Sequence, residues 1–162
     1  MMKIFLASFA AVTLLWITGC TSVGSYNVYF AGFNDHRNPD SRTNDGNMEY
    51  FGFSKDFKKN DWGFETGVNT YVDSYRQQSY SLFTKISHEK FRTKYITPVI
   101  AANCSYKGRS HDNDSMKTIC SPPLSLRLGP EKGIFGYFTA VPKVGTLTDG
   151  FVMLELGYRF MK

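Results

Sequence analysis

The chain has 162 residues, a formal net charge of +5 at pH 7, and 42% hydrophobic, 20% charged and 16% aromatic residues. Its mean hydropathy of −0.29 is too polar for a bundle of membrane helices, and its aromatic content is too high for a disordered chain. Three cysteines are too few for a small domain held together by disulfides alone, so one all-β or mixed domain remains.

The first twenty residues resemble a bacterial lipoprotein signal. Lys3 precedes an uncharged apolar segment over 4–19, which is shorter than the roughly 20 residues that a membrane helix needs. Small residues then precede Cys20, to which lipid would be attached, and Thr21 favours the outer membrane. An ordinary signal peptide with an incidental cysteine is the alternative. The expected divisions are a signal peptide over 1–19, a lipidated linker over 20–24 and a folded domain over 25–162.

Loss of the signal peptide removes one lysine and leaves a net charge of +4. An exported protein does not meet nucleic acid, so anionic lipopolysaccharide is the expected partner of its lysines and arginines.

Beyond Cys20 the hydrophobic pattern has a period of two residues, which is typical of half-buried strands. Between Trp62 and Val72, for example, apolar residues and threonines alternate with a face that carries Glu65. The pattern predicts eight strands, over 25–34, 48–56, 61–72, 79–88, 91–103, 119–128, 133–141 and 150–160.

The connections between these strands alternate in length. The short ones are 57–60, 89–90 and 129–132, and the long ones are 35–47, 73–78, 104–118 and 142–149. An even number of strands with short turns at one end and long loops at the other predicts an all-β fold. We expect an eight-stranded antiparallel up-and-down transmembrane β-barrel rather than a β-sandwich.

One face of the predicted strands carries Glu65, Lys85, Glu155 and Arg159. A lysine or arginine that faces hydrocarbon costs about 2–4 kcal/mol at the bilayer midplane, so this face is expected inside the barrel. A soluble lipocalin-like carrier, with the two faces reversed, is the alternative. Three glycines on the inward face are expected to thin the wall and make room inside: Gly63, Gly67 and Gly157.

Aromatic residues at the strand ends suit the girdles of a membrane barrel, notably Trp62, Tyr158 and Phe160. The ending GYRF resembles the terminal strand that outer-membrane barrels present to their assembly machinery. The barrel-assembly and lipoprotein-sorting machineries are therefore expected partners, and the protein is expected to be a monomer.

Cys104 and Cys120 flank a polar segment with turn-forming residues. Export places them in an oxidising compartment, which favours a disulfide. A metal site that includes His111 and Asp112 is the alternative, although no CxxC or HxxxH spacing supports it. No metal and no cofactor are expected.

A candidate catalytic site lies where the third predicted strand ends, at Asp73 and Ser74. A serine hydroxyl attacks an ester only when a base removes its proton, and His36 in the first long loop is the candidate base. The alternative is structural, because Asp and Ser are common in turns and His36 lies in a polar loop. Cations of the long loops are candidates for contacts with lipid phosphates: Arg37, Arg42, Arg76, Lys107, Arg109 and Lys117.

Two segments resemble the lipid A palmitoyltransferase (PagP) family, TGVNTYVDSYRQQSYSLF over 66–83 and CSPPL over 120–124. The resemblance implies a barrel with an acyl-binding interior, which moves a palmitoyl chain from phospholipid to lipid A. It also implies His, Asp and Ser at the outer rim. Asp73 and Ser74 match that motif, but Asn27 stands at the histidine position and cannot act as a base.

Three functions are therefore open. The first is an acyltransferase with phospholipid and lipid A as substrates. The second is a non-catalytic barrel that acts as a surface structural or interaction protein through its four outer loops. The third is a lipocalin-like carrier of small apolar ligands.

Overall fold

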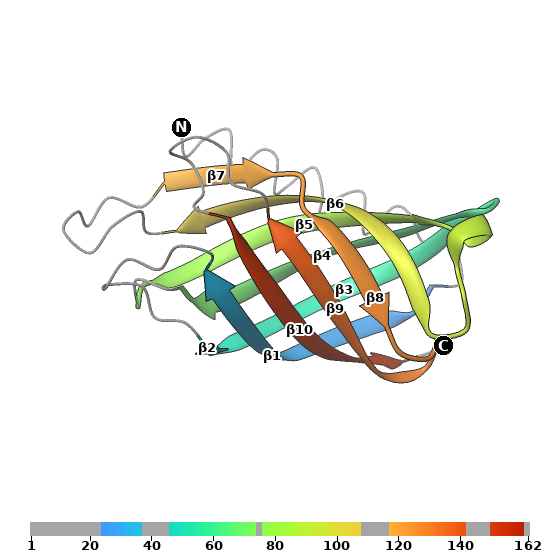
Figure 1. The fold of residues 1–162 in the computed structure, drawn as a ribbon, viewed down its shortest axis with the longest axis horizontal. Coiled ribbons are helices and arrows are strands. Elements are labelled where there is room, and N and C mark those ends of the chain that lie inside the picture. Colours follow the sequence, from blue (N-terminus) through green and yellow to red (C-terminus); the bar gives the residue numbers. More distant parts are fainter. Residues whose placement is uncertain (1–23, 37–45, 74–75, 108–116, 142–149, 161–162) are drawn as a thin grey trace.

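The computed structural model describes residues 24–36, 46–73, 76–107, 117–141 and 150–160. These residues form a closed antiparallel barrel (Figure 1). Its elements are β1 (Tyr26–His36), β2 (Gly46–Met48), β3 (Tyr50–Lys59), β4 (Trp62–Val72), β5 (Gln78–His88), the 3-10 turn η1 (Glu89–Phe91), β6 (Ile96–Lys107), β7 (Lys117–Ser121), β8 (Leu124–Leu128), β9 (Gly133–Val141) and β10 (Phe151–Phe160).

The ten strand segments form the eight strands of the barrel. β2 and β3 both pair with β1 and are separated only by Glu49, while β7 and β8 both pair with β6 and are separated by Pro122 and Pro123. Pairing of β10 with β1 closes the sheet. The predicted eight-stranded antiparallel barrel is confirmed. The β-sandwich is excluded because the sheet is closed, so that no strand has an edge that is unpaired along its whole length.

The two ends of the barrel differ. At what we call the short-turn end lie residues 60–61, 89–95 and 129–132, together with the first residue of β1 and the last of β10. The opposite, long-loop end is where β1 finishes, β9 finishes and β10 begins.

The prediction was wrong over 91–95, which belong to a turn rather than to a strand. His88 caps η1 by accepting a hydrogen bond from Lys90 N, and Arg92 N donates to Glu89 O at 3.0 Å. Thr93 then pairs its backbone N–H with Ile96 O at 2.8 Å, so the chain reverses before β6 begins.

The faces of the strands are as predicted. Glu65, Lys85 and Glu155 lie inside the barrel and are 3–5% exposed. Large apolar side chains cover the outside, including Ile100, Leu124 and Ile134, each at least 64% exposed. This arrangement excludes the reversed, lipocalin-like interpretation, because an apolar exterior around ionised side chains matches a hydrocarbon environment. No helix among the described residues is long and apolar enough to cross a membrane.

A β-bulge in β1 changes its inward face partway along. Tyr29 pairs with Gly157 and Ala31 pairs with Leu156, so Phe30 is the extra residue. Odd residues such as Tyr29 point inward before the bulge, and even residues such as Asn34 point inward after it. The bulge lets one strand contribute Tyr29 to the centre of the barrel and Asn34 to its long-loop end.

Inward glycines make room for neighbouring aromatic rings rather than for a ligand. A Cβ at Gly157 would lie 2.7 Å from Phe135 Cζ, and one at Gly67 would lie 2.7 Å from Phe83 Cζ and 2.5 Å from backbone. The expectation that the inward glycines open the lumen was therefore wrong for Gly67 and Gly157, since the space they leave is already filled, whereas a Cβ at Gly63 would meet only Ser87 Oγ, at 2.7 Å.

The apolar outer face predicts a sharp cost for a charge placed near the middle of a strand. Leu154→Arg should lower the free energy of folding into vesicles by about 2–4 kcal/mol, because Leu154 points outward midway along β10. The measurement is the urea midpoint, with the folded fraction read from heat-modifiable gel migration. Leu154→Val is the matched control, and folding of Leu154→Arg equal to that of the control would contradict the assignment of faces.

Candidate functional site

Three hydroxyl groups converge on the Glu65 carboxylate in the middle of the lumen. Ser54 Oγ donates to Glu65 Oε1 at 2.6 Å, Tyr137 OH donates to Oε2 at 2.6 Å, and Tyr29 OH also donates to Oε1. All four side chains are buried. These three hydrogen bonds replace those that the carboxylate loses when it is removed from water, and they stabilise its ionised form.

Lys85 connects this carboxylate to a second one. Its Nζ lies 3.3 Å from Glu155 Oε2 and donates to Tyr29 OH at 3.2 Å, and it stands 3.6 Å from the centre of the Tyr137 ring. Tyr50 OH donates to the other oxygen of Glu155. Lys85 is therefore held by an ion pair, a hydrogen bond and a cation–π contact at once.

We call these six side chains the lumen plug: Tyr29, Tyr50, Glu65, Lys85, Tyr137 and Glu155. Aromatic rings of the plug and of Phe83 and Phe135 pack around Tyr29, mostly edge-on, with ring centres 5.5–6.4 Å apart. The plug separates two cavities, and Lys85 lines both of them. Each cavity offers about 70 Å³ to the centres of water-sized molecules, which is room for a few waters and not for a long acyl chain.

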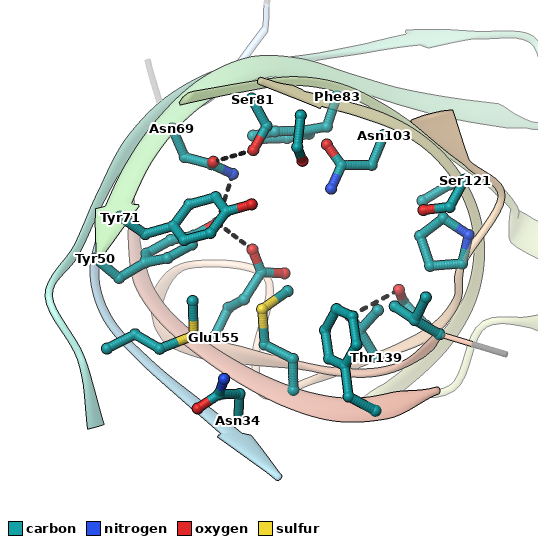
Figure 2. Close-up of a pocket in the computed structure, with 18 of the residues that line it drawn as sticks. Asn34, Tyr50, Asn69, Tyr71, Ser81, Phe83, Asn103, Ser121, Thr139 and Glu155 are labelled. Carbon is teal, nitrogen blue, oxygen red and sulfur yellow. Dashed lines mark hydrogen bonds between the residues drawn. The ribbon is translucent and has the colours of Figure 1, made fainter. Parts of the chain in front are cut away.

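The cavity toward the long-loop end is a polar cup. Figure 2 shows amide and hydroxyl side chains, among them those of Asn69, Ser81 and Asn103, around Glu155 and Tyr50. Asn69 donates to Tyr50 OH at 2.7 Å and accepts from Ser81 Oγ at 2.6 Å. The hydroxyl oxygens of Ser125 and Thr139 form a further hydrogen bond of 2.9 Å. Hydrogen bonds thus continue from the plug into the wall of the cup.

The cavity toward the short-turn end, the vestibule, contains the other lumen charges. Arg159 pairs with Asp56 at 2.6 Å and donates from Nε to Asn27 Oδ1 at 2.9 Å. Asn27 also donates to Asp56 Oδ2 at 3.1 Å. Arg127 is 5% exposed and donates to the backbone oxygens of Gly129 and Pro130. These contacts fix the β8–β9 turn to the barrel interior.

Outside the barrel at this end, a cluster of charged side chains joins the turns to one another: Lys58, Glu89, Arg92 and Glu131. Lys58 Nζ lies 2.9 Å from Glu89 Oε1, and this hydrogen bond, with that from Arg92, keeps the pKa of the Glu89 carboxyl below its usual value. Burial alone would lower the pKa of Arg92, but its hydrogen bonds to Glu131 and Glu89 raise it. The cluster ties three turns together across the short-turn end.

The structure places Asp73 at the long-loop end, as predicted, in a turn. Asp73 Oδ1 accepts from the Gln77 backbone N at 2.9 Å, and Oδ2 accepts from Ser79 Oγ at 2.9 Å. Its backbone N–H also donates to Gln77 O at 2.9 Å. These bonds match the structural alternative for an aspartate at a strand-to-loop junction.

The other residues of the predicted site are only partly covered by the described residues. Ser74 and His111 lie outside the described residues, as do Cys20 and the long-loop arginines Arg37, Arg42 and Arg109. His36 is the last residue of β1, at the same end as Asp73. Asn27 is at the opposite end, because it is the second residue of this eleven-residue strand.

The predicted disulfide between Cys104 and Cys120 is present. The two cysteines are direct partners in the β6–β7 ladder, on the outward face of the barrel. This bond occupies both thiols, so the alternative of a metal site at these residues is excluded. Among the described residues no group of three or more His, Cys, Asp or Glu side chains is placed to hold a metal ion.

The tyrosines of the plug were missed by sequence reasoning. A signal for them exists, because Tyr50 and Tyr137 fall on the inward face of their strands and a buried tyrosine hydroxyl needs a partner. Tyr29 could not be assigned in the same way, because the bulge at Phe30 breaks the alternation of β1.

No family model and no curated protein matches the chain. Among solved structures, a de novo designed transmembrane β-barrel matches with a TM-score of 0.51 and 8% identity, over 86% of this chain and 98% of that one. The outer membrane protein Ail of Yersinia pestis gives 0.46 and 18%, over 86% and 99%. The N-terminal β-barrel domain of Pseudomonas aeruginosa OprF gives 0.48 and 12%, over 86% and 98%.

The fold and the lumen together define a transmembrane β-barrel protein with a filled interior. At these identities the likeness shows the fold alone, and the designed barrel is the match that supports it. None of the comparisons supports the resemblance to the lipid A palmitoyltransferase family.

The plug predicts a large effect when its only lysine is removed. Lys85→Met should lower the free energy of unfolding by about 3–5 kcal/mol, because Glu65 and Glu155 are left as uncompensated buried charges. The measurement is urea unfolding of the protein in vesicles, followed by the fluorescence of Trp62.

Two controls separate charge from packing. Lys132→Met, at an exposed turn position, should change the free energy by less than about 0.5 kcal/mol. Lys85→Met combined with Glu155→Gln should regain part of the loss, because one of the unpaired charges is gone. A Lys85→Met protein as stable as the original would mean that the plug does not hold the barrel together.

Proposed function

We propose that the protein is a bacterial outer-membrane β-barrel lipoprotein that acts as a non-catalytic structural or interaction protein. The observation that carries this proposal is the lumen plug, whose hydrogen bonds and ion pair cross the described lumen between β1, β3, β4, β5, β9 and β10. A filled lumen favours a barrel whose partners bind at its ends over one that passes a solute or binds an acyl chain inside.

The position of the first strand supports a lipid anchor on Cys20. β1 begins at the short-turn end, and five residues lie between Cys20 and Tyr26. A chain of that length spans at most about 20 Å. An acyl group on Cys20 can therefore enter the membrane at the face where the short turns lie, which leaves the long segments on the opposite face.

Acyl transfer to lipid A is the competing proposal, and two features weigh against it. Both oxygens of Asp73 already accept hydrogen bonds from Gln77 and Ser79, and each of the two lumen cavities among the described residues is too small for a palmitoyl chain. We therefore assign Asp73 to the turn and treat Ser74 as non-catalytic.

Lipid A profiles distinguish the two proposals directly. We expect mass spectrometry of lipid A to give the same acylation pattern in cells with the protein, in cells without it and in cells with Ser74→Ala. A mass increase of one acyl chain that disappears in both Ser74→Ala and Asp73→Asn would overturn the non-catalytic proposal.

The anchor and the orientation are tested together. The intact mass of the purified protein should correspond to residues 20–162 plus acyl groups, and Cys20→Ser should lose these groups. An epitope inserted after residue 112 should bind antibody on intact cells, whereas one inserted after Lys132 should bind only after permeabilisation. Accessibility of the second epitope on intact cells would contradict the proposed orientation.

A further inference from the structure

The barrel wall has a notch between β5 and β6 at the short-turn end. The ladder between these strands ends with the pair Ile86 and Ile100. β5 continues to His88 and β6 has already begun at Ile96, so four residues of β6 pair only with β8 on their other side. Figure 1 shows the chain leaving β5 through η1 before it turns back into β6.

The sequence explains why the ladder stops there. Ala101 N donates to Pro123 O on the β8 side at 3.1 Å. The backbone N–H and C=O groups of successive strand residues face opposite neighbours, so the backbone nitrogen of Pro98 faces β5. Proline has no N–H to donate. Ile96 shares this edge, and its N–H and C=O are both bonded to Thr93. The notch can therefore face lipid without an unpaired donor at these two residues.

On the outside, the notch opens into an apolar groove of about 490 Å³. Trp62 and His88 lie at its short-turn end with ring centres 4.6 Å apart, and Phe91 of η1 lies 5.9 Å from His88. The remaining lining is mainly aliphatic and aromatic: Ile86, Pro98, Ile100, Leu124, Leu126, Phe138 and Ala140.

On the inside, the notch adjoins the vestibule. Ser87, His88 and Val99 line both the groove and the vestibule, so the two spaces meet at these residues. Apolar surface and a strongly charged rim therefore adjoin within one site, which matches an amphipathic ligand.

The charges at this rim favour an anionic head group. Arg92 is already paired with Glu89 and Glu131. Lys90 and Lys94 are exposed on either side of Phe91, and the described part of the chain gives neither of them a carboxylate partner. Phe91 lines the groove, and two such ammonium groups within three residues of it in the sequence complement a phosphate attached to acyl chains.

We propose that this notch binds one anionic glycerophospholipid, with an acyl chain in the groove and its phosphate at Lys90 and Lys94. The site depends on the transmembrane fold and not on the function proposed above, because its lining belongs to the strands of the wall and to η1.

Trp62 provides a local probe. It is the only tryptophan besides Trp16, so Trp16→Phe in the full chain leaves one indole fluorophore, at the groove. The experiment compares nanodiscs of phosphatidylcholine that contain a minor fraction of either acyl-brominated phosphatidylglycerol or acyl-brominated phosphatidylcholine. Each lysine near the membrane surface strengthens association with an anionic lipid about fivefold. Brominated phosphatidylglycerol should therefore have an apparent affinity at Trp62 at least about fivefold higher.

Matched variants locate the effect. Lys90→Gln with Lys94→Gln should abolish the preference at Trp62 without changing the quenching by brominated phosphatidylcholine. Trp62→Phe with Tyr158→Trp moves the probe to the outer face of β10 at the same end, where both lipids should quench equally. Equal quenching at Trp62 by the two lipids would indicate ordinary surrounding lipid and overturn the proposal. A preference that survives the lysine changes, or that is equally strong with the probe moved to β10, would also overturn it.

Discussion

The cost of placing an ionised side chain against hydrocarbon determines where the charges of the strands lie. Glu65, Lys85 and Glu155 each stand within the body of a strand, and the inward face is the position that spares them that cost. Once inside a narrow barrel they have lost most of their water, so each needs partners. The plug follows from this second requirement: Lys85 lies between two carboxylates, and tyrosine hydroxyls bind their remaining oxygens.

Packing in the lumen depends on pairing large inward residues with glycines. Phe83 lies over Gly67 and Phe135 lies over Gly157. A Cβ added to either glycine would also lie within 3 Å of a backbone oxygen of a neighbouring strand. A side chain at either glycine would have to displace the backbone as well as the ring. The glycines therefore allow Phe83 and Phe135 to reach the centre, where both rings pack edge-on against Tyr29 and the Phe83 ring centre lies 4.6 Å from Lys85 Nζ.

Much of this architecture could be predicted from the sequence, because a period of two residues is a local property. The eight barrel strands and their inward and outward faces follow from the two-residue alternation and the loop lengths. The Cys104–Cys120 disulfide follows from export to an oxidising compartment. The bulge at Phe30 and the turn at 91–95 could not be predicted in the same way. Both depend on hydrogen bonds to partners whose register the sequence does not specify.

The candidate site was harder to predict for a related reason. The pattern places Lys85 and Glu65 on the inward face, but it does not say which residues of other strands they meet across the lumen. Tyr29 and Tyr137 lie 56 and 72 residues from their partners Lys85 and Glu65. Asp73 and Ser74 drew attention because they are adjacent in sequence, and the described donors to the Asp73 carboxylate are Gln77 in its turn and Ser79 at the start of β5.

The plug does not hold every part of the wall equally. Its six side chains come from β1, β3, β4, β5, β9 and β10, whereas β6 and β8 contribute none. Those two strands are joined to the barrel mainly by their ladders, and one of these ends early because Pro98 has no N–H. These two strands also line the apolar groove, together with residues of β4, β5, η1 and β9. None of the plug's charged side chains lines the groove, so a lipid bound there would leave the buried ion pair undisturbed.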